Sequence, residues 1–251
     1  MPKRYRIDLF AGAGGLSCGL EQSGFVPVLA NELVEQYAHT YQVNHPETKM
    51  IVGDVRHVDE KELHSLLNAY DEIDLIAGGP PCQGFSVNAP VRSLDDPRNH
   101  LFKEYLRIVA EIRLKAVLIE NVPGIISLGK GIVVEQIYNI LECLGYKVSH
   151  RILFAGHYGV PQMWFRTVFI AIRDKISSIL FPKPQYYATA AANFRGAKDL
   201  CHMLTPMDEL LLKPKVTVWD TISDLPELKD DALSGKYLYS KRPQSEFQVY
   251  A

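Results

Sequence analysis

Short apolar runs alternate with segments of helical periodicity from the N-terminus to about residue 172. Several of the runs are almost continuously apolar, which is typical of parallel strands buried on both faces. The seven candidate strands lie at residues 4–10, 26–31, 50–55, 73–79, 115–121, 147–155 and 166–172. This order predicts an α/β fold with a Rossmann-like, doubly wound and mostly parallel sheet.

Two of the intervening segments carry apolar residues at helical spacing. One is predicted from Leu101, Tyr105, Val109 and their neighbours Leu106 and Ile112. The other is predicted from an apolar series that Gly145 ends, formed by Val133, Ile137, Ile140, Leu141 and Leu144.

The alternation stops near residue 174, so we expect a catalytic domain over 1–173 and an extension over 174–251. The stretch "VTVWDTISDLPELKD" predicts one short helix that begins after Thr217 or Asp220 and ends near Pro226. Residues 236–251 show no clear period.

Composition narrows the class of protein. The 251 residues are 47% hydrophobic, enough for a full core, and 27 basic against 29 acidic residues give a net charge of −2. That balance argues against binding nucleic acid through bulk positive charge, although a local basic face is compatible with it. The N-terminus lacks an apolar leader and no run of about 18 apolar residues occurs, so we expect a cytoplasmic protein without a membrane segment.

The four cysteines, Cys18, Cys82, Cys143 and Cys201, are widely spaced and form no C-x-x-C pair. This spacing indicates neither a metal site nor a disulfide framework.

Candidate chemistry lies where strands end, because doubly wound sheets bind ligands beyond the carboxyl ends of their strands. Glycines at 12, 14, 15 and 19 follow the first strand; they suit either a close approach to a ligand, as in a dinucleotide site, or tight packing alone. Glu32 follows the second strand and could bind ribose hydroxyls or lie solvated at a helix start. Asp54 follows the third and could accept from an adenine amino group or cap a helix.

The fourth strand ends in "GGPPCQGFSV", where Cys82 follows Pro80 and Pro81 on a stiff turn. This position favours a presented thiol over a buried structural one. Residues 83–98 then lack any pattern, and so long a stretch in a compact domain suits a lid over a substrate.

Charged residues accompany two further strands. Glu120 ends the fifth strand in "LIENV", at the sheet edge expected for Cys82, and a carboxylate there requires a partner or solvent. Gln162 and Arg166 precede the last strand, where the arginine suits a site or an ordinary surface position.

Taken together, these segments resemble the cytosine-C5 DNA methyltransferase family. The matching pieces are "DLFAGAGGLS", "NE", "GDV", "GGPPCQGFS", "DDPRNHLF", "IENV" and "VPQMWFR". They cover roughly residues 5–173, and "VTVWDTISDLP" is similar to the segment that precedes the family's DNA-reading region.

The resemblance implies an enzyme that transfers a methyl group from S-adenosylmethionine to C5 of a cytosine flipped out of duplex DNA. The type it implies is that of bacterial restriction-modification systems. It assigns Cys82 as nucleophile, Glu120 as the group on cytosine N3, and Arg166 as the group on O2 that also orients Glu120. It assigns to the cofactor Phe10, Gly12, Gly14, Glu32, Asp54, Pro81 and Leu101. It places Gln83, Ser86 and Gln162 beside the substrate or in the closing loop.

Two departures from the family pattern stand out. Trp164 replaces the first of two arginines expected after Gln162, which changes one backbone contact beside the flipped base. The DNA-reading region and the last two motifs have no counterpart before Ala251. We therefore expect a second polypeptide that carries them and docks on residues 174–251, where Trp219, Tyr237, Tyr239 and Phe247 could form the contact.

Three alternative functions are compatible with parts of the pattern. A family member acting on tRNA cytosine would use the same residues around Cys82. A silent regulatory subunit would not need both Cys82 and Glu120. A nicotinamide dehydrogenase is disfavoured because "FAGAGG" lacks the G-x-G-x-x-G spacing.

Overall fold

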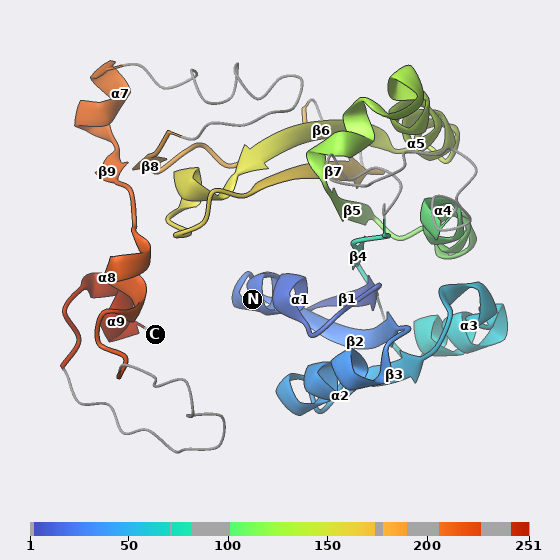
Figure 1. Ribbon diagram of the computed structural model, residues 1–251. Coiled ribbons are helices and arrows are strands. Elements are labelled where there is room, and N and C mark those ends of the chain that lie inside the picture. Colours follow the sequence, from blue (N-terminus) through green and yellow to red (C-terminus); the bar gives the residue numbers. More distant parts are fainter. Residues whose placement is uncertain are drawn as a thin grey trace. The chain divides into compact units, whose positions relative to one another are not determined.

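The computed structural model describes residues 3–70, 72–81, 101–173, 178–189, 206–226 and 242–250 (Figure 1). Cys82, Gln83 and Ser86 lie outside the described residues, as do Tyr237 and Tyr239. The chain forms two compact units, and each is described by itself. The first comprises Met1–Ile152 with Arg166–Phe181, and the second comprises Leu153–Phe165 with Pro182–Ala251. The boundary expected near residue 173 stays a prediction.

A seven-stranded sheet has the order β3-β2-β1-β4-β5-β7-β6 (Figure 1). Its strands are β1 (Arg4–Leu9), β2 (Phe25–Glu32), β3 (Lys49–Val52), β4 (Leu75–Gly78), β5 (Ala116–Asn121), β6 (Lys147–Phe154) and β7 (Phe165–Ile172). The five strands β1 to β5 pair in parallel, whereas β7 pairs antiparallel with β5. The predicted Rossmann-like, mostly parallel α/β sheet is confirmed.

Helices connect these strands. They are α1 (Gly15–Gln22), α2 (Glu35–Asn44), α3 (Glu60–Ala69), α4 (Leu101–Ile112) and α5 (Ile132–Cys143), with the 3-10 turns η1 (Val55–His57), η4 (Pro123–Ile126) and η5 (Leu128–Gly131). α4 packs against both α3 and α5, whereas α1 and α2 pack on β2. Both helices expected from periodicity are confirmed, and Gly145 follows α5 with the positive φ of 87° that suits glycine after a helix.

The core of the first unit lies between the parallel strands and these helices. Ile7 and Leu9 of β1 and Ile76 of β4 are fully buried, and Tyr105 and Ile108 of α4 are buried against them in the same cluster. The apolar stripe of α4 therefore does what its spacing predicts, because it covers the sheet and removes the strands from water.

The second unit contains shorter elements. They are η6 (Ala155–Tyr158), β8 (Tyr186–Tyr187), α7 (Pro206–Leu211), β9 (Lys213–Pro214), α8 (Val218–Ile222) and α9 (Glu246–Tyr250). Thr217 caps α8 in a reciprocal capping box with Asp220, so the first of the two expected entry points is the right one. α9 was not expected, because its turn depends on tertiary bonds: Ser245 donates to the Asp220 carbonyl and Gln248 donates to the Ser223 hydroxyl.

The strand order fixes where a ligand can bind. β1 lies between β2 and β4, so the chain runs outward in opposite directions from β1 and β4. In such sheets the helical connections diverge at this point and leave a crevice beyond the strand ends.

Among the described residues, no helix is long and apolar enough to cross a membrane.

Candidate active site

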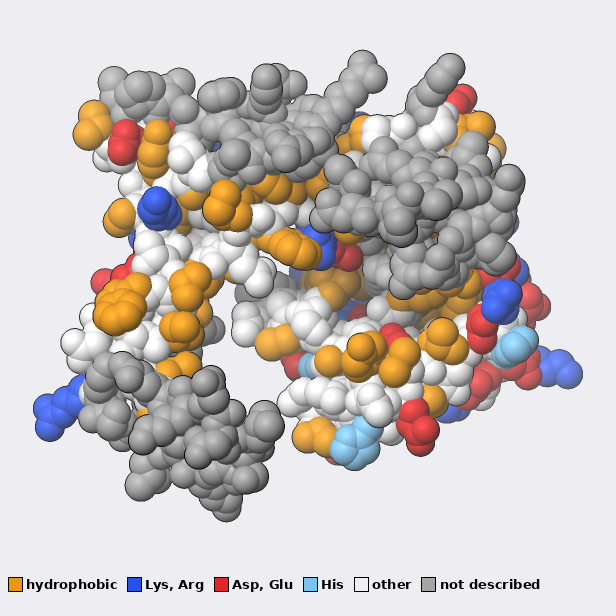
Figure 2. Space-filling view, viewed as in Figure 1, with side chains coloured by type: hydrophobic (Ala, Val, Ile, Leu, Met, Phe, Trp, Pro, Cys, Tyr) orange, Lys and Arg blue, Asp and Glu red, His pale blue; other side chains and the backbone are white. Residues whose placement is uncertain are grey.

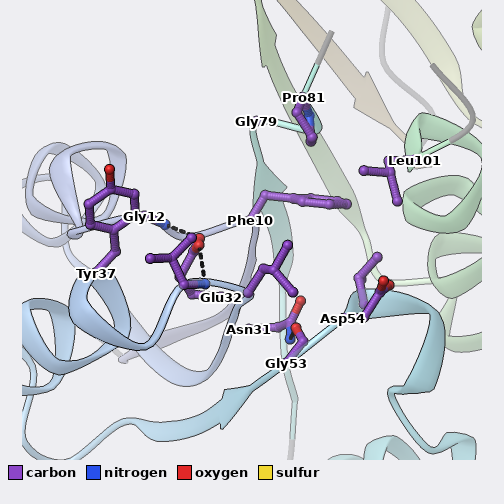
Figure 3. A pocket seen from close by; sticks show the side chains of 13 residues that line it. Phe10, Gly12, Asn31, Glu32, Tyr37, Gly53, Asp54, Gly79, Pro81 and Leu101 are labelled. Atoms are coloured by element: carbon purple, nitrogen blue, oxygen red, sulfur yellow. Dashed lines mark hydrogen bonds between the residues drawn. The ribbon is translucent and has the colours of Figure 1, made fainter. Parts of the chain in front are cut away.

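A cavity of about 360 Å³ lies beyond the carboxyl ends of β1 to β4 (Figure 3). Its volume is in the range that holds small-molecule ligands. Six of the seven sequence-predicted cofactor residues line it together: Phe10, Gly12, Glu32, Asp54, Pro81 and Leu101. Sequence patterns in five separate segments therefore converge on one cavity.

Glu32 is anchored by two backbone amides. Its Oε2 accepts from the amide of Gly12 at 2.8 Å, and its Oε1 accepts from the amide of Val34 at 2.9 Å (Figure 3). The residue is only 8% exposed, so the alternative of a solvated glutamate at a helix start does not hold. Because a carboxylate has about four acceptor positions, two remain for hydroxyl groups of a ligand.

Asp54 has the role of a cap in the structure. Its carboxylate accepts from the backbone amide of Arg56 at 2.9 Å, at the start of η1, and also from the Arg56 guanidinium. The side-chain hydrogen bond from Arg56 lowers the pKa of Asp54 to about 2, so the carboxylate is charged at neutral pH. It also lines the cavity, so capping and ligand contact are compatible.

The glycine-rich turn presents two different faces. The amide of Gly12 points to Glu32 at the cavity, and the Phe10 side chain extends toward Leu101 (Figure 3). Gly14 is not among the cavity-lining residues. A Cβ on Gly14 would lie 3.1 Å from Nε2 of His45 and 3.3 Å from Cδ2 of Tyr41, so Gly14 packs on α2 and its C-terminal end.

Glu120 and Arg166 form an ion pair between β5 and β7. The side chains are 32% and 33% exposed, so neither is an isolated surface charge. Burial raises the pKa of Glu120, while the Arg166 charge opposes that rise. The Glu120 carboxyl therefore takes up a proton more readily than usual, and the ion pair with Arg166 orients it.

A second, smaller cavity of about 130 Å³ adjoins Glu120. Its lining includes Asp8, Phe10, Gly79 and Glu120. Phe10 and Gly79 also line the larger cavity, so the two spaces meet at these residues. The larger cavity therefore adjoins the space beside the Glu120 carboxylate.

The turn that leads to Cys82 is held from β5. Asn121 is 4% exposed, and its side-chain amide donates to the carbonyl oxygen of Pro80 at 3.0 Å. Its Oδ1 accepts from the backbone amide of Val122 at 2.8 Å. The residue after Glu120 therefore fixes the backbone two positions before Cys82.

Several cavity residues were missed by sequence reasoning. They are Asn31, Leu33, Val34, Tyr37, Gly53, Val55 and Gly79. Most of them directly precede or follow Glu32 or Asp54 in the sequence, so their position next to these predicted residues could have indicated that they line the cavity. Asn31 donates to the carbonyls of Ile51 and Gly53, which joins the ends of β2 and β3, and this tertiary role has no local signature.

Gln162 and Trp164 belong to the second unit, and Arg166 belongs to the first. The amide of Gln162 donates to the carbonyl of Val160 at 2.8 Å, within a tight turn. Trp164 is 51% exposed, and its carbonyl accepts from the amide of Ala155.

In the described part of the chain, no cluster of three or more potential ligands could hold a metal ion.

Comparison with known proteins identifies relatives over nearly the whole chain. The family described as C-5 cytosine-specific DNA methylase matches residues 5–247. Type II methyltransferase M1.HphI of Haemophilus parahaemolyticus is 39% identical over 72% of this chain and 48% of its own length. Type II methyltransferase M.AgeI of Thalassovita gelatinovora is 36% identical over 96% of this chain and 56% of its own.

The share of the relative that is covered varies. This chain spans about half the length of the first two relatives, whereas M.AquIA of Picosynechococcus, also a type II methyltransferase, is 34% identical over 88% of both chains. A crystal structure of an E. coli prophage protein described as a DNA modification methyltransferase superposes with a TM-score of 0.66 and 29% identity, over 90% of this chain and 56% of that one. The match to the family covers both the parallel sheet and the cavity at its edge, and the chain belongs to the C-5 cytosine-specific DNA methylase family.

Proposed function

We propose that this chain carries the catalytic part of a type II DNA cytosine-C5 methyltransferase that uses S-adenosylmethionine. One observation carries the proposal: Phe10 and Gly79 line both the larger cavity and the smaller one that Glu120 borders. The space proposed for the methyl donor therefore adjoins the group proposed to act on the cytosine.

The residues of the larger cavity fit the cofactor. Glu32 retains acceptor positions for the two ribose hydroxyls, while Phe10, Pro81 and Leu101 offer apolar surface to an adenine ring. Asp54 is charged and could accept from the adenine amino group without losing its cap. Bound S-adenosylmethionine would supply an electrophilic methyl group.

The chemistry of the base is assigned to three residues of this chain. The Cys82 thiolate adds to C6 of cytosine, and the electron pair of the C5–C6 double bond becomes available at C5. Glu120 donates to N3 and stabilises the negative charge that the ring gains, a role that its raised pKa favours. Arg166 holds Glu120 in place and could donate to the cytosine O2.

The reaction ends when the thiolate leaves. After C5 is methylated, a general base removes the C5 proton, the electron pair re-forms the C5–C6 double bond, and the bond between Cys82 and C6 breaks.

The target cytosine must be flipped out of the duplex, because a stacked cytosine exposes neither ring face to the thiol. Gln83 and Ser86 of the segment after Cys82 are proposed to close over the flipped base.

Covalent trapping tests this assignment. With the active assembly of chain and partner, duplex DNA with 5-fluorocytosine at the target should remain attached after methyl transfer, because fluorine at C5 prevents proton removal. Cys82→Ser should abolish the adduct, while Cys143→Ser, at an exposed cysteine on α5, serves as the control and should retain it. An undiminished adduct with Cys82→Ser would refute the nucleophile, and parallel assays on tRNA would detect the alternative substrate.

We further infer that a second polypeptide supplies DNA reading. The support is an exposed apolar surface on α8 and α9 of the second unit (Figure 2). Val218 is 56% exposed, Trp219 73%, Ile222 50% and Val249 75%. Exposed aromatic and aliphatic groups of this kind are typical of protein contacts. The near-complete mutual coverage with M.AquIA shows that a type II methyltransferase chain of this span exists.

The partner proposal is tested by methyl transfer to mixed-sequence duplex DNA, with and without the product of a neighbouring gene that carries a DNA-reading region. The isolated chain should be nearly inactive, and the partner should raise its rate. Trp219→Ser should weaken that activation, whereas Leu180→Ser, at a residue 83% exposed in the first unit, should not. Sequence-specific methylation by the isolated chain at a rate that the partner leaves unchanged would refute the proposal.

A further inference from the structure

Four polar side chains form a buried cluster behind the glycine-rich turn. This Asp8 cluster consists of Arg6, Asp8, Ser17 and Tyr41, and none of the four is more than 4% exposed. The Asp8 carboxylate accepts from Nε of Arg6 at 2.9 Å, from the Ser17 hydroxyl at 2.6 Å and from the Tyr41 hydroxyl at 2.6 Å. None of the chemical steps proposed above uses these bonds.

The cluster joins four elements that surround the turn. Arg6 and Asp8 lie on β1, Ser17 on α1 and Tyr41 on α2. Arg6 also donates to the carbonyl of Ser17 at 3.0 Å and to the carbonyl of Phe25 at the start of β2. The turn at residues 11–14 runs from β1 to α1, so both of its ends are tied to the same carboxylate.

Stability alone does not account for such a cluster. Removing an arginine and a carboxylate from water has a large unfavourable free energy, and well-packed apolar residues often serve equally well at such sites. Directional hydrogen bonds differ from apolar contacts because they fix relative positions. The cluster therefore suits a site where geometry matters, and the turn supplies the Gly12 amide that anchors Glu32.

Tyr41 contacts the turn in a second way. A Cβ on Gly14 would meet Cδ2 of the Tyr41 ring at 3.3 Å, and Gly14 has a φ of 98°. The turn thus lies directly on the ring, while the hydroxyl of the same ring donates to Asp8. Tyr41 itself lines neither of the two cavities described above.

We propose that Tyr41 is a positioning residue for cofactor binding, acting through its hydrogen bond to Asp8 and its ring contact with Gly14. The hydroxyl fixes the ring, the ring supports the turn, and the turn holds the Gly12 amide against Glu32. This inference rests on the proposed function, since the ligand that benefits is S-adenosylmethionine or its product S-adenosylhomocysteine.

The test compares Tyr41→Phe with Tyr146→Phe in the full chain. Tyr146 is a matched control, because it is also buried and its hydroxyl donates to a single acceptor, the carbonyl of Leu114, at 2.6 Å. Both variants lose one buried hydroxyl. Calorimetric titration with S-adenosylhomocysteine should show about a fivefold weaker affinity for Tyr41→Phe and little change for Tyr146→Phe.

A second measurement needs no ligand. In a chain with ¹⁵N-labelled glycine, the amide signals of Gly12 and Gly14 should shift in Tyr41→Phe and stay in place in Tyr146→Phe. Gly159, which belongs to the second unit, gives an internal reference in both variants. Urea unfolding shows that each variant is fully folded under the titration conditions, so that a fall in affinity does not reflect unfolded chain. Ser17→Ala, which removes another bond to Asp8, should shift the same two signals.

The outcomes separate this inference from the proposed function. Equal affinities and unmoved Gly12 and Gly14 signals for Tyr41→Phe would overturn the positioning role. If wild-type chain failed to bind S-adenosylhomocysteine, the cofactor assignment would fall, and the glycine signals would still decide whether Tyr41 fixes the turn.

Discussion

Arg166 forms an ion pair with Glu120 across the antiparallel strands β7 and β5. Only tertiary structure brings them together, since 46 positions separate them in the sequence and the pairing of Glu120 with Val168 sets the register. The pair holds a carboxyl whose burial raises its pKa and whose partner limits that rise.

Glu120 should titrate above its ordinary pKa of 4.5. A carboxyl whose pKa is raised on folding stabilises the folded state in its protonated form. That contribution is present below the ordinary pKa and is lost as the pH rises through the raised value. The free energy of unfolding of wild type relative to Glu120→Gln, which cannot titrate, should therefore fall across this window and then become constant.

Arg166→Gln supplies the matching test, because it removes the charge that opposes protonation. Carbon-13 NMR of the Glu120 carboxyl should show a higher pKa in this variant than in wild type. An unchanged titration would mean that Arg166 does not act on Glu120.

Glu120→Gln should slow methyl transfer by about 10²-fold or more, because the amide cannot give a proton to N3. The affinity for S-adenosylhomocysteine should stay nearly unchanged, as expected of a group that acts on the transition state. Single-turnover methyl transfer with the active assembly measures the rate, and equal rates would remove Glu120 from the mechanism.

Glu32→Gln should weaken S-adenosylhomocysteine binding by about tenfold. The new amide group would face the backbone amide of Gly12 or Val34, where two donors cannot bond to each other. Glu35→Gln, at an exposed position in the first turn of α2, is the control and should bind normally. Calorimetry compares the two, and comparable affinities would contradict the role of Glu32.

Asn121→Ala should lower the rate of adduct formation with 5-fluorocytosine DNA by about tenfold, because the carbonyl of Pro80 loses its donor and the turn before Cys82 loosens. Cofactor affinity should change little. Asn44→Ala removes a similar side-chain bond, to the carbonyl of Thr40 at the surface, and should leave the rate intact. A rate equal to that of this control would show that Asn121 has no part in presenting Cys82.

Gly78→Ala should destabilise the fold by about 1–3 kcal/mol, since a Cβ there would overlap the carbonyl of Leu9 and lie 2.9 Å from Cε2 of Tyr105. Gly19→Ala places the same methyl group in open space on α1 and should stabilise by up to about 1 kcal/mol. Urea unfolding measures both, and a stabilising Gly78→Ala would contradict the close approach of β1 and β4.

The sequence by itself determined the order of the seven sheet strands and the presence of α4 and α5, because apolar periodicity acts locally and each buried strand or helix face carries its own pattern. It also determined which residues follow the strand ends, and hence that Phe10, Gly12, Glu32 and Asp54 would line one cavity. Local pattern could not separate the two expectations for Glu32 or for Asp54. The hydrogen bonds from the amides of Gly12 and Val34 showed that Glu32 is not solvated, and the bond from the Arg56 amide showed that Asp54 caps η1 while it lines the cavity. The ribose and adenine contacts stay predictions.

Tertiary structure alone decided the pairings between distant side chains. Glu120 with Arg166, Asn121 with Pro80, and Tyr41 with Asp8 each depend on strand register or helix packing, which no local window specifies. It likewise placed Gly14 against α2, although sequence reasoning gave Gly12 and Gly14 the same task. A glycine in the sequence indicates only that a side chain does not fit at its position. Whether a ligand or a neighbouring ring takes up the space of that side chain depends on the tertiary packing around the glycine.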